Sequence, residues 1–165
     1  AMFRYALSER TGKDAEIEAT IKKNIIAVAD ALVETSYNDI YGRPLDRYYW
    51  GCNGTVARQA LNLYVASRLN DRPEYKNTAL NAISHIFGRN YYDRSYVTGV
   101  GHNPPMHPHD RRSGADGIEA PWPGYIVGGG HSATDWVDEQ ESYSHNEVAI
   151  NWQAGIVFAL AWFVN

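Results

Sequence analysis

Glu147 is the first candidate for chemistry, because it stands where the chain changes from polar to apolar. An acidic, aromatic segment begins at Trp136, and a strongly apolar segment ends at Asn165. The apolar side chains that recur there at helical spacing are Trp152, Ile156, Leu160 and Phe163. The spacing predicts a terminal helix, and because apolar residues surround most of it, we expect an inner-layer helix. A carboxylate at the mouth of a buried helix is a candidate acid–base residue.

The same segment also fits a purely structural role for Glu147. Ser144 and Glu147 have the spacing of a capping box, in which both side chains accept backbone N–H groups at a helix start. In that case the carboxylate would stabilise the terminal helix and take no part in a reaction. The spacing alone favours this capping interpretation.

A pair of carboxylates indicates a particular reaction. Asp138 and Glu147 lie in the same segment, and His109 and Arg111 are polar companions from an earlier one. The chain also has twelve Tyr and five Trp, whose flat faces can stack on sugar rings. Carboxylates combined with aromatic surfaces are the chemistry of glycoside cleavage. No Gly-x-Ser-x-Gly motif is present, and nothing near the single cysteine, Cys52, would activate it as a nucleophile.

The composition excludes several classes of partner. The 165 residues are 44% hydrophobic, which is enough for one compact domain with a core. The net charge is −4, and no cluster of Lys and Arg appears, so we expect neither a nucleic-acid nor an anionic-membrane partner. No apolar run is long enough to span a bilayer.

The elements that must position the candidate residues are helices. Apolar residues at helical spacing predict four of them before the terminal one, and the first has no cap, as if the chain began inside a fold. Ile17, Ile21, Ile25, Val28 and Leu32 share one face of the second helix. The predicted ranges are 2–8, 14–35, 56–70 and 71–88. Short turns between helices indicate an all-α fold of antiparallel pairs.

Helical patterns disappear between Arg89 and Gln140. This stretch is rich in Gly and Pro, so a long ordered loop region or a set of short strands is predicted. A loop this long inside a compact domain is usually functional. Asp116 and Gly117 form a candidate calcium corner, although a solvated loop is the favoured interpretation.

Two motifs resemble a known family. Residues 95–103 (SYVTGVGHN) and 105–111 (PMHPHDR) resemble the histidine signature of glycoside hydrolase family 9, the cellulases, and residues 136–149 resemble its acidic signature. The resemblance covers nearly the whole chain. It implies that residues 1–165 are the C-terminal part of a single catalytic domain, namely the last portion of an (α/α)6 barrel of six helix hairpins.

The resemblance also implies roles for the candidate residues. Glu147 would be the general acid, Asp138 its companion carboxylate, and His109 a further catalytic-site residue. Substrate contacts would come from Arg111, Trp50, Tyr143 and Trp152. The family inverts the anomeric carbon with an Asp base in an Asp-Ala-Gly-Asp motif, which these residues lack. We therefore expect the base from an N-terminal part of the same domain, joined or docked.

The remaining expectations follow from the same resemblance. The substrate would be cellulose or a cello-oligosaccharide, the protein would be secreted, and a structural calcium ion would have Asp116 as its best local ligand. The sequence departs from the family at 151–154, where Asn-Trp-Gln-Ala replaces the usual Asp-Tyr-Asn-Ala. The alternative function is a non-catalytic, helical carbohydrate-binding domain in which Glu147 only caps its helix.

Overall fold

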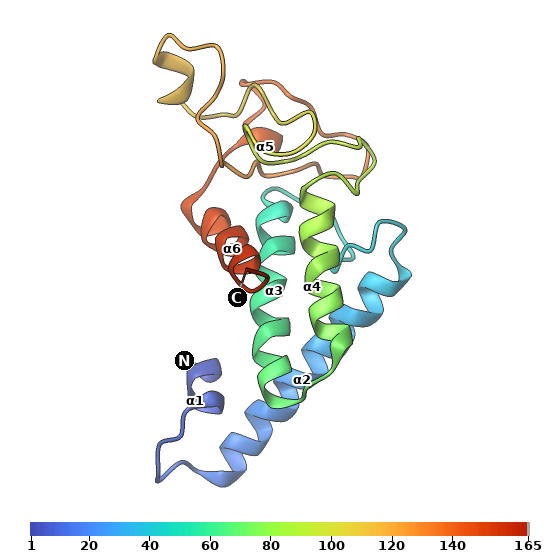
Figure 1. Cartoon of the computed structure of the whole chain (residues 1–165), viewed down its shortest axis with the longest axis vertical. Coiled ribbons are helices and arrows are strands. Elements are labelled where there is room, and N and C mark those ends of the chain that lie inside the picture. Colours follow the sequence, from blue (N-terminus) through green and yellow to red (C-terminus); the bar gives the residue numbers. More distant parts are fainter. Residues whose placement is uncertain (165) are drawn as a thin grey trace.

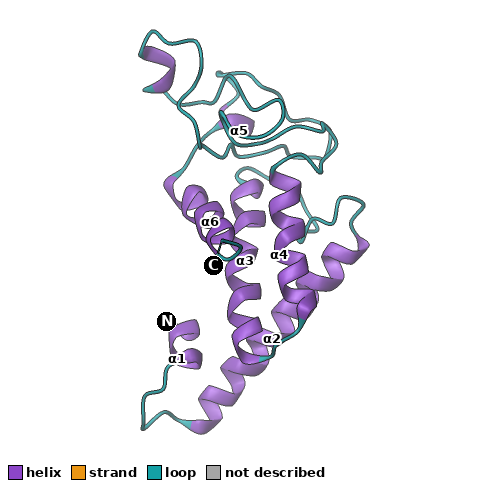
Figure 2. Ribbon diagram, viewed as in Figure 1, coloured by secondary structure: helices purple, strands orange, loops and turns teal. Residues whose placement is uncertain are grey.

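The computed structural model describes residues 1–164 and is built from helices and loops (Figures 1 and 2). The elements are α1 (Met2–Leu7), α2 (Ala15–Asn38), α3 (Cys52–Leu69), α4 (Pro73–Ile86), the 3-10 turn η1 (Ser113–Ala115), α5 (Tyr143–Asn146) and α6 (Ile150–Ala161). Across these described residues, extended segments meet only in isolated bridges and form no strand. The predicted all-α class is therefore confirmed. Asn165, at the end of the predicted terminal segment, lies outside the described residues.

Helix α3 is the centre of the helical part, because it contacts α1, α2, α4 and α6. Figure 1 shows it between α4 and α6, with α2 crossing obliquely. The apolar residues Val56, Ala57, Ala60 and Leu63 of this helix are fully buried. A three-residue turn follows, and Pro73 begins α4 at a position where its missing N–H is not needed.

Two details of the predicted helices are wrong. Ile17 and Val28 were assigned to the inner face of α2, yet their side chains are 53% and 49% exposed. The buried face of that helix is centred on Ile25 and Ala29 instead, because these residues meet the neighbouring helices. Likewise, the helix predicted to start at residue 71 begins at Pro73, and its N-cap Arg72 makes no side-chain capping hydrogen bond.

Helix α6 is buried on one side only within the described chain. Trp152, Ile156 and Ala159 pack inward, whereas Ile150 on the opposite side is 89% exposed and Val157 is 65% exposed. The prediction of an inner-layer helix is thus met on the side that faces α3. No helix within residues 1–164 combines the length and the apolar character needed to cross a bilayer.

The predicted long loop region is ordered and covers one end of the helices (Figure 1). Its own core contains Tyr96, Ile126, Val127 and Trp136, all buried. Hydrogen bonds tie distant parts of it together, such as Val127 N to the carbonyl of Tyr96 at 3.0 Å. These loops, with α3 and α6 beneath them, form the frame for Glu147.

Candidate active site

Three extended segments meet at Glu147 and fix its backbone. His109 N donates to the carbonyl of Asn146 at 2.8 Å, and Gly128 N donates to the carbonyl of Glu147 at 3.0 Å. Val127 and Val148 form an antiparallel bridge beside them. Segments far apart in the sequence therefore hold the main chain on both sides of this carboxylate.

Glu147 does not cap the start of α6; it is the C-cap residue of α5, where its backbone N–H donates to the carbonyl of Tyr143. It follows α5 in an extended conformation (φ −60°, ψ 149°), and the N-cap of α6 is Ala149. Ser144, the other half of the predicted capping box, lies inside α5. The capping interpretation is wrong because the polypeptide forms a separate short helix before Glu147, which sits between two helices. Its Oε2 instead accepts a hydrogen bond from Trp50 Nε1 at 2.9 Å.

Trp50 and Trp152 lie edge to face, with ring centroids 5.2 Å apart, but they have different environments. Trp50 is 49% exposed, so its ring is open to a ligand. Trp152 is 5% exposed and packs against Gly51 and Gly54 of the α3 start. Trp152 therefore offers little free surface to a ligand, and its predicted substrate contact stays a prediction. The Trp152 ring packs against one side of the Trp50 ring.

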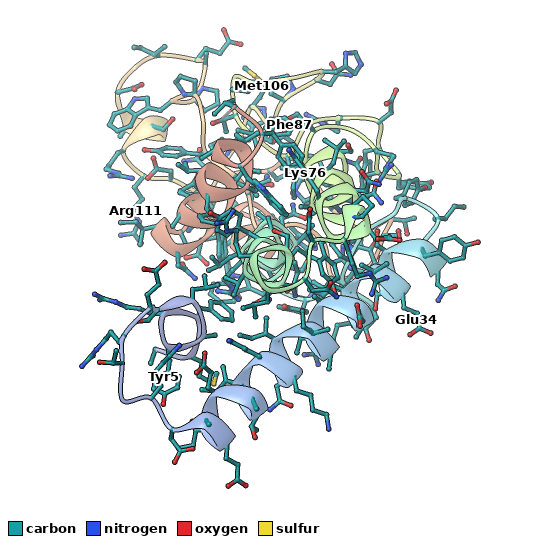
Figure 3. All side chains as sticks on the ribbon, turned by 60° about the horizontal axis from the view of Figure 1, so that its bottom comes forward. Tyr5, Glu34, Lys76, Phe87, Met106 and Arg111 are labelled. Atoms are coloured by element: carbon teal, nitrogen blue, oxygen red, sulfur yellow. The ribbon has the colours of Figure 1, made fainter. Side chains whose placement is uncertain are left out.

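A hydrogen bond to the main chain fixes the tautomer of His109. Its Nδ1 lies 2.6 Å from the carbonyl oxygen of Gln140, and since a carbonyl only accepts, Nδ1 must carry the hydrogen. Within the described residues Nε2 makes no hydrogen bond. The ring lies 6.2 Å from that of Tyr143, which is 63% exposed. Arg111, on the adjoining loop, is exposed too (Figure 3).

Asp138 is occupied by hydrogen bonds that organise the loop carrying His109. Its Oδ2 accepts from Met106 N at 2.9 Å and from Arg94 Nη2 at 3.1 Å, and its Oδ1 accepts from His107 N at 3.0 Å. The side chain is only 16% exposed. These hydrogen bonds give Asp138 a structural role, because they hold the backbone of Met106 and His107 against the acidic segment that begins at Trp136.

The comparison with known proteins decides the family. The sequence model of glycosyl hydrolase family 9 matches residues 3–160. The chain belongs to this family. It is 60% identical to endoglucanase D of Acetivibrio thermocellus over 99% of this chain and 27% of that protein. Among solved structures, it is similar to a metagenome-derived family 9 endoglucanase (TM-score 0.90, 33% identity, 98% of this chain and 32% of that one).

A third relative shows the family with sugars bound. Endoglucanase CelQ of Clostridium thermocellum, in complex with cellobiose and cellotriose, aligns with 68% of this chain and 21% of its own length (TM-score 0.61, 33% identity). This chain thus covers about a fifth to a third of the length of these three family 9 proteins. Its helices are a portion of the family's (α/α)6 barrel, as the sequence predicted.

The calcium expectation does not fit the surroundings of Asp116. Oδ1 accepts from Ile118 N at 2.9 Å, and Oδ2 accepts from Trp122 Nε1 at 2.6 Å, so both oxygens serve the loop. Nowhere in residues 1–164 do three or more His, Cys, Asp or Glu side chains gather as metal ligands.

Two residues of the site escaped the sequence analysis. Asn146 is fully buried and donates from Nδ2 to the carbonyls of His107 (3.1 Å) and Glu139 (3.3 Å), which joins the two family 9 signatures. Arg43, also fully buried, donates to the carbonyls of Leu45 and Arg47 in the loop before Trp50. The position of Asn146 beside Glu147 was a usable signal, whereas nothing in the sequence around Arg43 marked it as buried.

Proposed function

We propose that this chain is the C-terminal part of a family 9 enzyme that hydrolyses β-1,4-glucosidic bonds in cellulose or related β-glucans, with Glu147 as the general acid. The observation that carries the proposal is the placement of this carboxylate. Its backbone is fixed by two other segments, one oxygen is held by Trp50, and the other accepts no hydrogen bond within residues 1–164. A carboxyl group held this way can donate a proton in one direction.

The proposed reaction inverts the anomeric carbon. Glu147 gives its proton to the glycosidic oxygen as the bond from that oxygen to the anomeric carbon breaks. A water molecule attacks the same carbon from the opposite face, and its proton passes to an Asp base from an N-terminal part of the domain. The base must stand about 6.5–9.5 Å from the acid to leave room for the water.

Four side chains on the segments around Glu147 suit a sugar chain. The face of Trp50 offers an aromatic platform, and Tyr143 offers a second exposed ring. His109 Nε2 and the Arg111 guanidinium are polar groups that can hydrogen-bond sugar hydroxyls. We assign these four residues to substrate contact near the cleavage point.

The proposed enzyme needs a source for its catalytic base, and its substrate bears on where it acts. The relatives are three to four times as long as this chain, which supports an N-terminal part of the same catalytic domain as the source of the base. Because cellulose is an insoluble polymer, we also propose that the full-length protein acts after secretion.

The test is cellotetraose hydrolysis by the full-length protein and its Glu147→Gln variant. Glutamine keeps the shape but has no proton to give, so we expect the rate to fall by roughly 10²- to 10⁴-fold. Glu141→Gln, at an exposed carboxylate of the same segment, is the matched control and should retain the parent rate.

Two results would contradict the proposal. Near-normal hydrolysis by the Glu147→Gln variant would remove Glu147 from the reaction. Binding of cellotetraose by the parent protein without any release of sugar would favour the carbohydrate-binding alternative. NMR of the first-formed product tests inversion separately, because an inverting enzyme releases the α-anomer from a β-linked chain.

A further inference from the structure

Trp50 and Glu147 are joined across 97 residues of sequence by the hydrogen bond from Nε1 to Oε2. We propose that Trp50 is a positioning residue for the acid, separate from its service as a sugar platform. Its indole N–H holds Oε2 of Glu147, so that Oε1 is the oxygen that carries the proton to the glycosidic oxygen. This inference rests on the function proposed above.

The hydrogen bond selects one orientation of the carboxyl group. A glutamate side chain that is only half-buried can rotate about its terminal bonds, and rotation would exchange the two oxygens. An N–H donor at 2.9 Å removes that freedom when the donor itself cannot move. Misplacing a reacting group by about 1 Å can lower the reaction rate by a large factor. Holding this carboxyl group in one orientation should therefore raise the rate of proton transfer to the glycosidic oxygen.

Packing against Trp152 fixes the Trp50 indole on one side. The two rings meet at an interplanar angle of 70°. Trp152 cannot retreat, because it is buried where α3 begins, against the backbone of Gly51 and Gly54. A Cβ at either glycine would lie 2.4 Å or less from the Trp152 ring. These two glycines and Trp152 therefore make a rigid base under Trp50.

The loop that leads to Trp50 is fixed by a buried cation. The Arg43 guanidinium donates to the carbonyls of Leu45 and Arg47 and stacks on the Tyr48 ring, 3.9 Å from its centroid. The residue is completely buried, so these bonds do not compete with water. Arg43 thereby fixes the conformation of the loop that ends at Trp50.

The two roles of Trp50 can be separated by experiment. Roughly half of the side chain is exposed, which leaves ring surface for a sugar while the N–H points to Glu147. Trp50→Phe keeps an aromatic ring and removes the N–H. Loss of acid positioning slows only substrates whose leaving group needs a proton, whereas loss of a platform weakens binding of all glucan substrates.

The experiment compares kcat and KM of the full-length protein and its Trp50→Phe variant on two substrates. Cellotetraose has a poor leaving group that needs the acid, and 2,4-dinitrophenyl β-cellobioside has one that departs without a proton. We expect kcat on cellotetraose to fall about ten-fold or more and kcat on the aryl substrate to stay within about two-fold. Glu147→Gln should show the same pattern more strongly.

Trp122→Phe is the matched control. Trp122 is 41% exposed and donates its indole N–H to the carboxylate of Asp116. Trp122→Phe therefore removes the same kind of N–H donor from a different carboxylate. It should leave the ratio of the two rates unchanged. If Trp50→Phe does not fold, 3-benzothienylalanine at position 50 keeps the shape of the indole without its N–H and should give the expected pattern.

The outcomes distinguish the two proposals. Equal losses on both substrates, a change in KM alone, or parent-like rates in the Trp50→Phe variant would overturn the positioning role while the Glu147→Gln result upholds the acid. A parent protein that hydrolyses neither substrate would overturn the proposed function, and this inference with it.

Discussion

His85 shows at the residue scale how a buried group ties stability to pH. It is 2% exposed, and burial, reinforced by the positive charge of Arg43, lowers its pKa to about 3 from an ordinary value of 6.5. The folded protein therefore keeps this histidine neutral where the unfolded chain protonates it. Its contribution to stability is complete above pH 6.5 and is lost as the pH falls from 6.5 towards 3.

This difference in pKa makes a numerical prediction. Between pH 7 and pH 5, His85 should lower the free energy of unfolding by about 2 kcal/mol. His85→Phe, which cannot take a proton, should show a weaker loss over the same range in denaturant titrations. The same replacement at exposed His102 is the control. Equal pH dependence in the parent and the His85→Phe variant would contradict the assignment.

Residue identities were easier to predict from sequence than residue environments. The motifs identified Glu147 and His109, and the structure places their backbones side by side. Trp152 was predicted both in a buried helix and as a substrate contact, because an aromatic residue looks the same in a core as on a sugar platform, and the structure shows it buried. The contact from Trp50 to Glu147 was beyond prediction, since it depends on how two distant segments fold together.

At the scale of elements, the crossing of α3 and α6 decides the geometry of the site. The helices approach closely because Gly155 of α6 faces the α3 backbone, and a Cβ there would lie 3.2 Å from Arg58 N. Gly54 plays the matching part on α3, since its missing side chain makes room for Trp152. The sequence predicted both helices, but not that glycines set their distance.

Gly54→Ala tests this crossing. The added Cβ would lie 2.3 Å from Cγ of Trp152, which is far inside van der Waals contact. Overpacking of this kind typically costs about 1–3 kcal/mol, and the better helix propensity of alanine recovers only part of it. We expect a net loss of roughly 2 kcal/mol in the free energy of unfolding.

A double-variant cycle identifies the cause of that loss. With Trp152→Gly in the background, Cβ, Cγ and Cδ1 of residue 152 are all removed, so the alanine at position 54 has room and Gly54→Ala should cost much less there than in the parent. A cost that is the same in both backgrounds would mean that the strain lies elsewhere in α3.

At the scale of the whole molecule, α6 and α2 leave apolar side chains uncovered. Ile150 and Val157 of α6 are largely exposed, directly opposite the face that packs on α3. Ile17 and Val28 of α2 are exposed apolar residues as well. The sequence predicted Ile17 and Val28 as inward-facing because periodicity shows that a face is apolar, but not which part of the protein covers it. We infer that the N-terminal part of the domain covers the α6 face.

Val157→Asp tests this arrangement in the full-length protein. If other helices of the barrel cover Val157, the variant buries an unpaired carboxylate and should lose about 3 kcal/mol or more in the free energy of unfolding. Ala27→Asp, at an exposed position on the polar side of α2, is the control and should change stability by less than about 0.5 kcal/mol. Two variants of equal stability would mean that the α6 face meets solvent in the full-length protein, and the base would then have to reach Glu147 from a segment that does not pack on this helix.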